Sequence, residues 1–148
     1  MLYTPMTEKA MKLAYRAHHG QTDKAGLPYI FHPARVASGF TDEAGACAAW
    51  LHDVAEDTPV TLEEIRRMGF PAATCVALAL LTHDDAVPYM DYVKRLAAND
   101  VARAVKLADL RDNMDVTRLP VWDEAARERV EKYRRAYRYL SGREEETL

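Results

Sequence analysis

The sequence predicts an all-α protein, and three observations support that prediction. Apolar residues recur at helical spacing along most of the chain, and no segment alternates convincingly with a period of two. Capping residues, glycines and prolines divide the chain into segments of helix length. No internal repeat or low-complexity tract appears. We therefore expect a compact bundle of about seven or eight helices.

The first half of the chain contains three predicted helices and one long loop. Thr4 and Pro5 form a helix start, because Thr can cap a helix and Pro is tolerated at its first position, and this helix should stop at Gly20. Gly26 and Pro28 exclude a regular helix from QTDKAGLPYIFHP, so this segment is predicted to be a loop that carries functional side chains. Further helices are predicted from about Pro33 to Phe40 and from Asp42 to Glu56.

The second half contains five more predicted helices. Thr61 and Glu64 form a capping box for a short helix that Gly69 ends, and Pro71 opens the helix of ATCVALALLT. After the break at Val87–Pro88, helices are predicted over YMDYVKRLAAN, over DVARAVKLADLRDNMD and from Asp123 to about Leu140. The last helix has an apolar stripe that we expect to dock on the body of the protein, with a dimer contact as the alternative; the stripe consists of Ala126, Val130, Tyr133, Tyr137 and Leu140.

Length, composition and charge narrow the class of protein. The 148 residues have the usual size of one domain, and we expect residues 1–148 to form one. A content of 49% hydrophobic and 29% charged residues is typical of a globular protein and not of a disordered one. The net charge of −3 argues against broad nucleic-acid binding, but it allows a small anionic ligand where lysines or a metal offset the field. The composition predicts no particular oligomeric state.

Cysteine usage and hydropathy predict the compartment. Cys47 and Cys75 lie in apolar stretches without CxxC spacing, which is typical of small buried side chains in a reducing environment. The segment MLYTPMTEKA lacks the features of a signal peptide, and the longest apolar run, CVALALL, is too short to cross a bilayer. We expect a cytoplasmic protein without a membrane segment.

The segment WLHDVAEDT, residues 50–58, holds one histidine and three carboxylates. On one continuous helix, His52 and Glu56 would lie one turn apart, with Asp53 and Asp57 on the neighbouring stripe. The preceding AGACAAWL is almost entirely small or apolar, so this helix is predicted to be buried. Buried carboxylates need partners such as a cation or a metal.

A second polar cluster consists of Lys106, Asp109 and Asn113, which share one helix face at positions i, i+3 and i+7. A third candidate is His32 in PYIFHP, which directly precedes the predicted helix that begins at about Pro33.

Together, these segments offer the ligands of a catalytic metal site. His32, His52, Asp53 and Asp109 would supply two imidazole nitrogens and carboxylate oxygens to one divalent ion and leave positions open for water. Such mixed ligands do not choose strongly among Mn²⁺, Fe²⁺, Co²⁺, Ni²⁺ and Zn²⁺, and we predict Mn²⁺.

The order HHGQ, DKAG.PYI.HP, LHDVAEDT and KLADLRDNM resembles the hydrolase domain of the RelA/SpoT type in the HD superfamily, in the stand-alone form called small alarmone hydrolases. The likeness runs from about Ala14 to Met114, and HP, HDxxED and KLADxxxN in this order make it specific. It implies an all-helical HD fold and a metal-dependent hydrolase that removes the 3′-pyrophosphate from guanosine tetra- or pentaphosphate.

The resemblance also implies residue roles. Metal ligation falls to the four residues already named, and Glu56 and Asp57 match the catalytic acidic pair that would orient or deprotonate a metal-bound water. Lys24 matches a substrate-contacting lysine, and Asn113 matches a nucleoside-contacting asparagine. Lys106 could also offset phosphate charge, although a salt bridge to Asp109 explains it equally well.

Several positions depart from the family pattern. Asp23 stands where the family usually has an arginine that contacts the base, Leu27 stands where glutamate is frequent, and LRD at 110–112 replaces RLH. Asp23 could instead accept a hydrogen bond from the base or hold Lys24. An alternative substrate is therefore another nucleotide, such as an adenine alarmone or a nucleotide with a 2′- or 3′-phosphate. A non-catalytic nucleotide-binding or antitoxin-like protein is a further alternative, against which the intact HDxxED argues.

Some candidate residues have simpler explanations. Glu56 and Asp57 could form a solvated pair at a helix end before Thr58–Pro59. His83 in THDD forms a second HD pair without a matching upstream motif, and we expect it at a helix end. His18 and His19 could serve the site or pack beside it. The chain leaves no room for a synthetase domain, so any alarmone activity is expected to be hydrolytic only.

Overall fold

The predicted all-α class is confirmed by the computed structural model, which describes residues 1–142. Within these residues the chain forms nine α-helices and one short 3-10 helix, and its only strand-like pairing is an isolated bridge between Thr22 and Pro28. The elements are α1 (Pro5–Ala17), α2 (Phe31–Ala37), α3 (Glu43–Leu51), α4 (Val54–Asp57), α5 (Leu62–Arg67), α6 (Ala72–Leu81), α7 (Tyr89–Leu96), α8 (Asp100–Asn113), η1 (Val116–Arg118) and α9 (Glu124–Leu140).

The start of α1 follows the local chemistry of its sequence. The Thr4 hydroxyl accepts a hydrogen bond from the Thr7 N–H, and the Thr7 hydroxyl accepts one from the Thr4 N–H, so the two residues form a reciprocal cap around Pro5. The helix ends at Ala17, earlier than predicted, and the chain turns at Gly20 with a φ of 85°. This left-handed conformation favours glycine.

The predicted continuous helix from Asp42 to Glu56 is wrong, because the chain breaks it between α3 and α4. Asp42 caps α3 as expected, but α3 ends at Leu51 and α4 begins only at Val54. Nδ1 of His52 lies 2.7 Å from the Ala49 carbonyl, the group that a continuous helix would pair with the Asp53 N–H. The break turns His52 and Asp53 inward and adds one helix to the predicted number.

The core surrounds α3, which is rich in small residues. Cys47, Ala48, Ala49 and Leu51 are fully buried, and α3 packs against α1, α2, α6 and α8. Small side chains let these helices approach α3 closely. Both cysteines are free, with Cys47 buried and Cys75 half-buried.

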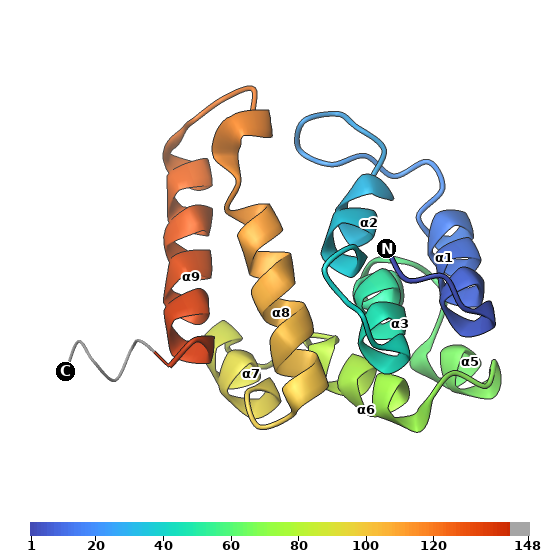
Figure 1. Cartoon of the computed structure of the whole chain (residues 1–148). Helices are drawn as coiled ribbons and strands as arrows, with labels where there is room; N and C mark the ends of the chain where they lie inside the picture. The colour runs from blue at the N-terminus through green and yellow to red at the C-terminus, as the bar shows by residue number, and fades with distance from the viewer. Residues whose placement is uncertain (143–148) are drawn as a thin grey trace.

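The last helix docks on the body as its apolar stripe predicted. α9 runs beside α8 and also packs against α7 (Figure 1). Ala126, Val130 and Leu140 are buried, whereas Tyr133 and Tyr137 are half-buried. Among residues 1–142, no helix combines the length and the hydropathy that crossing a membrane requires.

Candidate functional site

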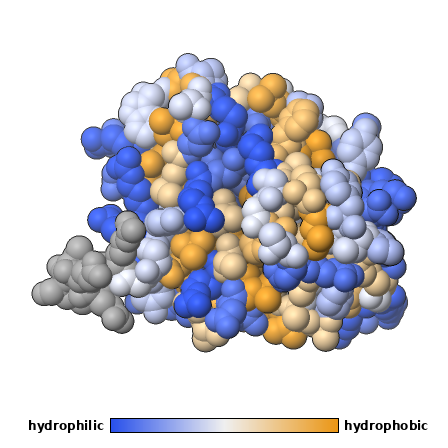
Figure 2. Space-filling view, in the orientation of Figure 1, coloured by the Kyte–Doolittle hydropathy of each residue, from blue (hydrophilic) through white to orange (hydrophobic). Residues whose placement is uncertain are grey.

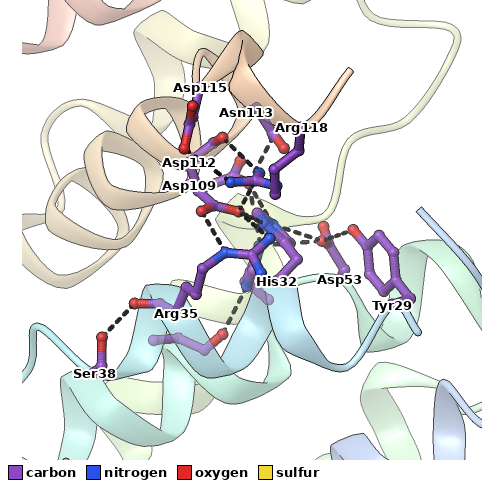
Figure 3. A network of polar contacts seen from close by, with 12 residues as sticks. Tyr29, His32, Arg35, Ser38, Asp53, Asp109, Asp112, Asn113, Asp115 and Arg118 are labelled. Atoms are coloured by element: carbon purple, nitrogen blue, oxygen red, sulfur yellow. Dashed lines mark hydrogen bonds and ion pairs between the residues drawn. The ribbon is translucent and has the colours of Figure 1, made fainter. Parts of the chain in front are cut away.

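The four predicted metal ligands meet in one place. His32 comes from α2, His52 and Asp53 come from the turn between α3 and α4, and Asp109 comes from α8. Their side chains are 4%, 3%, 14% and 4% exposed, respectively. Figure 3 shows His32, Asp53 and Asp109 pointing toward a common centre. Helices that are distant in the sequence therefore assemble one buried cluster.

The spacing of the ligand atoms suits a single divalent ion. Nε2 of His32 lies 3.2 Å from Nε2 of His52 and 2.9 Å from Oδ1 of Asp109. Nε2 of His52 lies 3.1 Å from Oδ2 of Asp53 and 3.3 Å from Oδ1 of Asp109. Ligand atoms that each lie about 2.1 Å from one ion are separated by about 3.0 to 3.4 Å in octahedral or tetrahedral geometry.

Hydrogen bonds at the rear of both imidazoles favour one tautomer. Nδ1 of His52 lies 2.7 Å from the Ala49 carbonyl, and Nδ1 of His32 lies 2.6 Å from Oδ2 of Asp112. Both oxygens are acceptors, so each Nδ1 carries a proton, and Nε2 is the ring nitrogen that faces the cluster. The two Nε2 atoms and the carboxylate oxygens together favour positive charge, which a proton on Nε2 supplies without metal and a bound cation would supply in its place.

The charges of the cluster also call for a cation. Burial opposes ionisation of Asp53, yet the neighbouring His52 and His32 lower its pKa to about 2. Burial likewise opposes protonation of His52, but the adjacent Asp53 and Asp109 outweigh it and raise its pKa well above the ordinary value. The carboxylates are therefore ionised at neutral pH, and positive charge is favoured among them.

The face of α8 predicted from helical spacing is present. Burial opposes ionisation of Asp109, but Nζ of Lys106, 2.9 Å from Oδ2 of Asp109, and both histidines hold the pKa of this carboxyl well below its usual range. Asn113 donates from Nδ2 to Oδ1 of Asp109 over 3.0 Å. The salt bridge that offered an alternative explanation of Lys106 is thus formed, and the Lys106 ammonium also lies near the ring of Tyr92.

Glu56 and Asp57 lie beside this cluster on α4. Carboxylate oxygens of Asp53, Glu56 and Asp57 lie within 4.8 Å of one another. Burial, followed by the charge of Asp53, raises the pKa of Asp57. Burial also raises the pKa of Glu56, although the His83 backbone N–H donates to Oε1 of Glu56 over 2.6 Å and opposes the rise. Both residues are exposed, and both line the cleft in front of the cluster.

A cleft of about 500 Å³ opens in front of the cluster. In the space-filling view, hydrophilic residues gather at the upper centre, where Figure 1 places the end of α8 (Figure 2). Lys24 and Asp23 line the cleft from the loop after α1. Oδ1 of Asp23 accepts backbone hydrogen bonds from Ala25 over 2.9 Å and from Leu27 over 3.0 Å, so this carboxylate folds its own loop.

Sequence reasoning gave no role to two residues that hold the ligands. The Tyr29 hydroxyl donates a hydrogen bond to Oδ2 of Asp53, and burial raises the pKa of Tyr29 so that it stays a donor. Asp112 binds Nδ1 of His32 and forms a two-point ion pair with Arg35. Asp112 follows Asp109 by three positions, so helical spacing was the signal that could have found it.

The remaining histidines occupy three different environments. His83 follows the end of α6, as expected for a helix end, and its ring lies 2.7 Å from the Val87 carbonyl. His18 is buried and packs 4.9 Å from the Tyr29 ring, whereas His19 is exposed.

Known proteins resemble this chain along most of its length, although no family model matches it. The human protein named "Guanosine-3′,5′-bis(diphosphate) 3′-pyrophosphohydrolase MESH1" is 36% identical over 142 residues, which cover 84% of this chain and 76% of that protein. The GTP pyrophosphokinase of Streptomyces coelicolor is 32% identical over 142 residues, covering 85% of this chain and 17% of its own length. A guanosine-3′,5′-bis(diphosphate) 3′-pyrophosphohydrolase of Aquifex aeolicus is 32% identical over 136 residues, covering 84% of this chain and 19% of its own.

A solved structure shares the fold. It is described as "A metazoan ortholog of SpoT hydrolyzes ppGpp and plays a role in starvation responses", and it superimposes with a TM-score of 0.78 at 23% identity over 95% of this chain and 87% of that one. The resemblance predicted from the motifs is therefore confirmed. This chain belongs to the MESH1-like family of (p)ppGpp 3′-pyrophosphohydrolases within the HD superfamily.

Proposed function

We propose that this protein is a metal-dependent hydrolase that removes the 3′-pyrophosphate from guanosine 3′,5′-bispyrophosphate-type alarmones, giving GDP or GTP and pyrophosphate. One observation carries the proposal: in a chain of this family, four buried acceptor atoms converge beside two further carboxylates at the floor of a cleft. This combination supplies a place for an ion, a group to handle a proton and room for a nucleotide.

His32, His52, Asp53 and Asp109 would hold the ion. Imidazole nitrogen and carboxylate oxygen accept several divalent ions, and Mn²⁺ is the one that we propose. A divalent ion bound there would lower the pKa of a bound water toward about 7 and so supply hydroxide near neutral pH. Tyr29 would keep Asp53 oriented through its hydroxyl.

Glu56 and Asp57 are proposed to orient the attacking water and to accept its proton. Their pKa values are raised by burial, which strengthens each as a base once it is ionised. The His83 N–H donates to one oxygen of Glu56, the other oxygen has no such bond to His83, and Glu56 lines the cleft. The attack forms an oxygen–phosphorus bond at the 3′-linked phosphorus, and the bond from that phosphorus to the ribose oxygen breaks. The proton taken from the water is returned to the ribose oxygen, which gives a 3′-hydroxyl and pyrophosphate.

Four residues are proposed to act on the substrate. Their surroundings indicate which part of the substrate each would contact or influence. Lys24 is exposed on the loop and suits the phosphates. Asn113 lines the cleft next to Asp109 and suits the nucleoside. The charge of Lys106 is already shared with Asp109, so it would act on the phosphates through the field of the site. Asp23 keeps one carboxylate oxygen clear of its loop hydrogen bonds, and that oxygen could accept an N–H from a base.

An adenine alarmone or a nucleotide with a 2′- or 3′-phosphate is the second candidate substrate. Asp23 favours it, because a carboxylate at the cleft cannot stack on or donate to guanine as an arginine does. We further propose that the nucleotide is the principal partner and that the protein acts in the cytoplasm, which two free cysteines support.

A nucleotide panel tests the proposal. Purified protein is incubated with guanosine and adenosine 3′,5′-bispyrophosphates and with 2′- and 3′-phosphorylated nucleotides, in Mn²⁺ or in EDTA, and products are separated by anion exchange. We expect Mn²⁺-dependent release of pyrophosphate from the guanosine compound. Turnover of only the adenosine or monophosphorylated compounds would establish the second candidate. Binding without turnover of any compound would establish a non-catalytic protein.

A further inference from the structure

Asp112 contacts a metal-ligand candidate from behind. It lies one helical turn after Asp109 on α8, and its Oδ2 lies 2.6 Å from Nδ1 of His32, on the side of the ring away from the ligand cluster. Both side chains are labelled in Figure 3. The Asp112 side chain is 11% exposed and that of His32 is 4% exposed. This contact is therefore sheltered from competing water.

Two arginines from different elements hold the Asp112 carboxylate. Arg35, on the same helix as His32, donates from Nε to Oδ1 over 2.7 Å and from Nη2 to Oδ2 over 3.0 Å. Arg118 of η1 donates from Nη2 to the Asp112 carbonyl over 3.1 Å and lies 3.4 Å from Oδ2. A planar guanidinium bound at two points leaves the carboxylate little rotational freedom.

The two imidazoles of the cluster differ in what fixes their tautomers. His52 depends on a main-chain carbonyl, which no substitution removes. His32 depends on the side chain of Asp112. The direction of the Nε2 lone pair of His32 is thus set by a residue that is outside the ligand set and that itself lines the cleft.

We infer that Asp112 is a positioning residue of the metal centre: it keeps the proton of His32 on Nδ1 and aims Nε2 at the ion, while Arg35 and Arg118 keep Asp112 in place. This inference rests on the metal site proposed above. Partners of this kind commonly change metal affinity about 10- to 100-fold when they are removed.

Asparagine at this position cannot satisfy both neighbours. If its amide oxygen faces His32, its NH₂ group meets the N–H of Arg35 Nε. If its NH₂ group faces His32, Nδ1 must accept, and the proton moves to Nε2, where it blocks the ion. Asp112→Asn therefore perturbs the tautomer with almost no change in volume.

Asp115→Asn is the matched control. Asp115 is three positions further along, and its Oδ2 lies 3.0 Å from Nη1 of Arg118, so this change also removes one negative charge beside the same arginine. The asparagine oxygen can still cap η1, where Asp115 accepts from Thr117, and no hydrogen bond or ion pair joins Asp115 to His32 within residues 1–142.

The experiment measures Mn²⁺ binding by calorimetry on full-length protein stripped of metal. It measures the His32 ring tautomer by ¹⁵N NMR on the same protein, at a pH high enough for the ring to be neutral. We expect Asp112→Asn to bind Mn²⁺ about 10- to 100-fold more weakly than wild type and to lose the Nδ1–H tautomer of His32, with Asp115→Asn unchanged in both. Arg35→Gln should also weaken Mn²⁺ binding, by a smaller factor. If Asp112→Asn does not fold, Arg35→Gln is the variant that tests the inference.

Wild-type affinity and an unchanged His32 tautomer in the folded variants would overturn the inference. Failure of the wild type itself to bind Mn²⁺ would instead overturn the proposed metal site. The tautomer measurement separates the two cases, because it needs no metal.

Discussion

Replacing Lys106 by methionine tests how α8 balances the charge of the ligand cluster. The Lys106 side chain is 13% exposed and its Nζ lies 2.9 Å from Oδ2 of Asp109, which is 4% exposed. Methionine keeps most of the aliphatic length against the rings of Tyr89 and Tyr92 but removes the charge. The variant therefore leaves Asp109 without its ammonium partner.

The size of the effect follows from this geometry. At 2.9 Å and an effective dielectric constant of 20, the attraction is about 6 kcal/mol before desolvation is subtracted. Removing one partner of a buried pair costs about 3 to 5 kcal/mol. His32 and His52 also face Asp109 and can take up protons, so we expect the lower end, about 3 kcal/mol of unfolding free energy, in EDTA.

Bound metal should reduce the destabilisation that Lys106→Met causes. A divalent ion bound to Asp109 supplies positive charge and repels Lys106, so the loss caused by Lys106→Met should shrink in saturating Mn²⁺. Lys94→Met is the control, because Lys94 lies 5.8 Å from the centre of the Tyr139 ring on the exposed side of α7, and its loss should cost less than about 1 kcal/mol.

The assay is urea unfolding followed by circular dichroism, with each variant in EDTA and in Mn²⁺. The reasoning is refuted if Lys106→Met destabilises the metal-free protein no more than Lys94→Met does, or if Mn²⁺ leaves the difference between them unchanged.

Four further predictions concern the cleft. Glu56→Gln and Asp57→Asn should each retain Mn²⁺ by metal analysis but lose about 100-fold in kcat, and a wild-type kcat would remove that residue from the mechanism. Burial raises the pKa of Asp57 above 3.8, so its proton is bound more tightly in the folded state. In EDTA, Asp57→Asn should therefore raise Tm at pH 7, and this gain should vanish below about pH 4; an equal gain at both pH values would contradict the assignment. Lys24→Ala should raise KM more than it lowers kcat, and Asp23→Arg should increase kcat/KM for guanosine relative to adenosine substrates; an unchanged ratio would mean that Asp23 faces away from the base.

The convergence of the four proposed metal ligands could be predicted from the sequence because few buried arrangements suit such side chains. His32, His52, Asp53 and Asp109 are costly to bury separately, whereas one ion accounts for all four. Their residue types therefore predicted that they lie together although they are far apart in the sequence. The structure places the same four side chains in one cluster.

The local shape of the HDxxED segment was less predictable. Apolar periodicity favoured one helix through residue 56, but the bond between the His52 ring and the Ala49 carbonyl ends α3 at Leu51. Such a competition between a side chain and the backbone depends on where the ring points, and the ring points toward residues from other helices.

Residues that support the ligands needed three-dimensional information. Tyr29 and Asp112 contact Asp53 and His32 across gaps between elements. Helical spacing places Asp112 near Asp109 on α8, but no local pattern pairs Asp112 with His32 or Tyr29 with Asp53. The role of Asp23 also needed the structure. Its position in the motif suggested a contact with the base, whereas its Oδ1 accepts hydrogen bonds from two backbone N–H groups of its own loop.

The most direct test of the proposed function is ³¹P NMR of guanosine 3′,5′-bispyrophosphate incubated with the protein and Mn²⁺. The 3′-diphosphate resonances should disappear while the 5′-diphosphate resonances persist, and one pyrophosphate should appear for each nucleotide consumed. Release of inorganic phosphate, loss of the 5′-diphosphate or an unchanged spectrum would contradict a 3′-pyrophosphohydrolase.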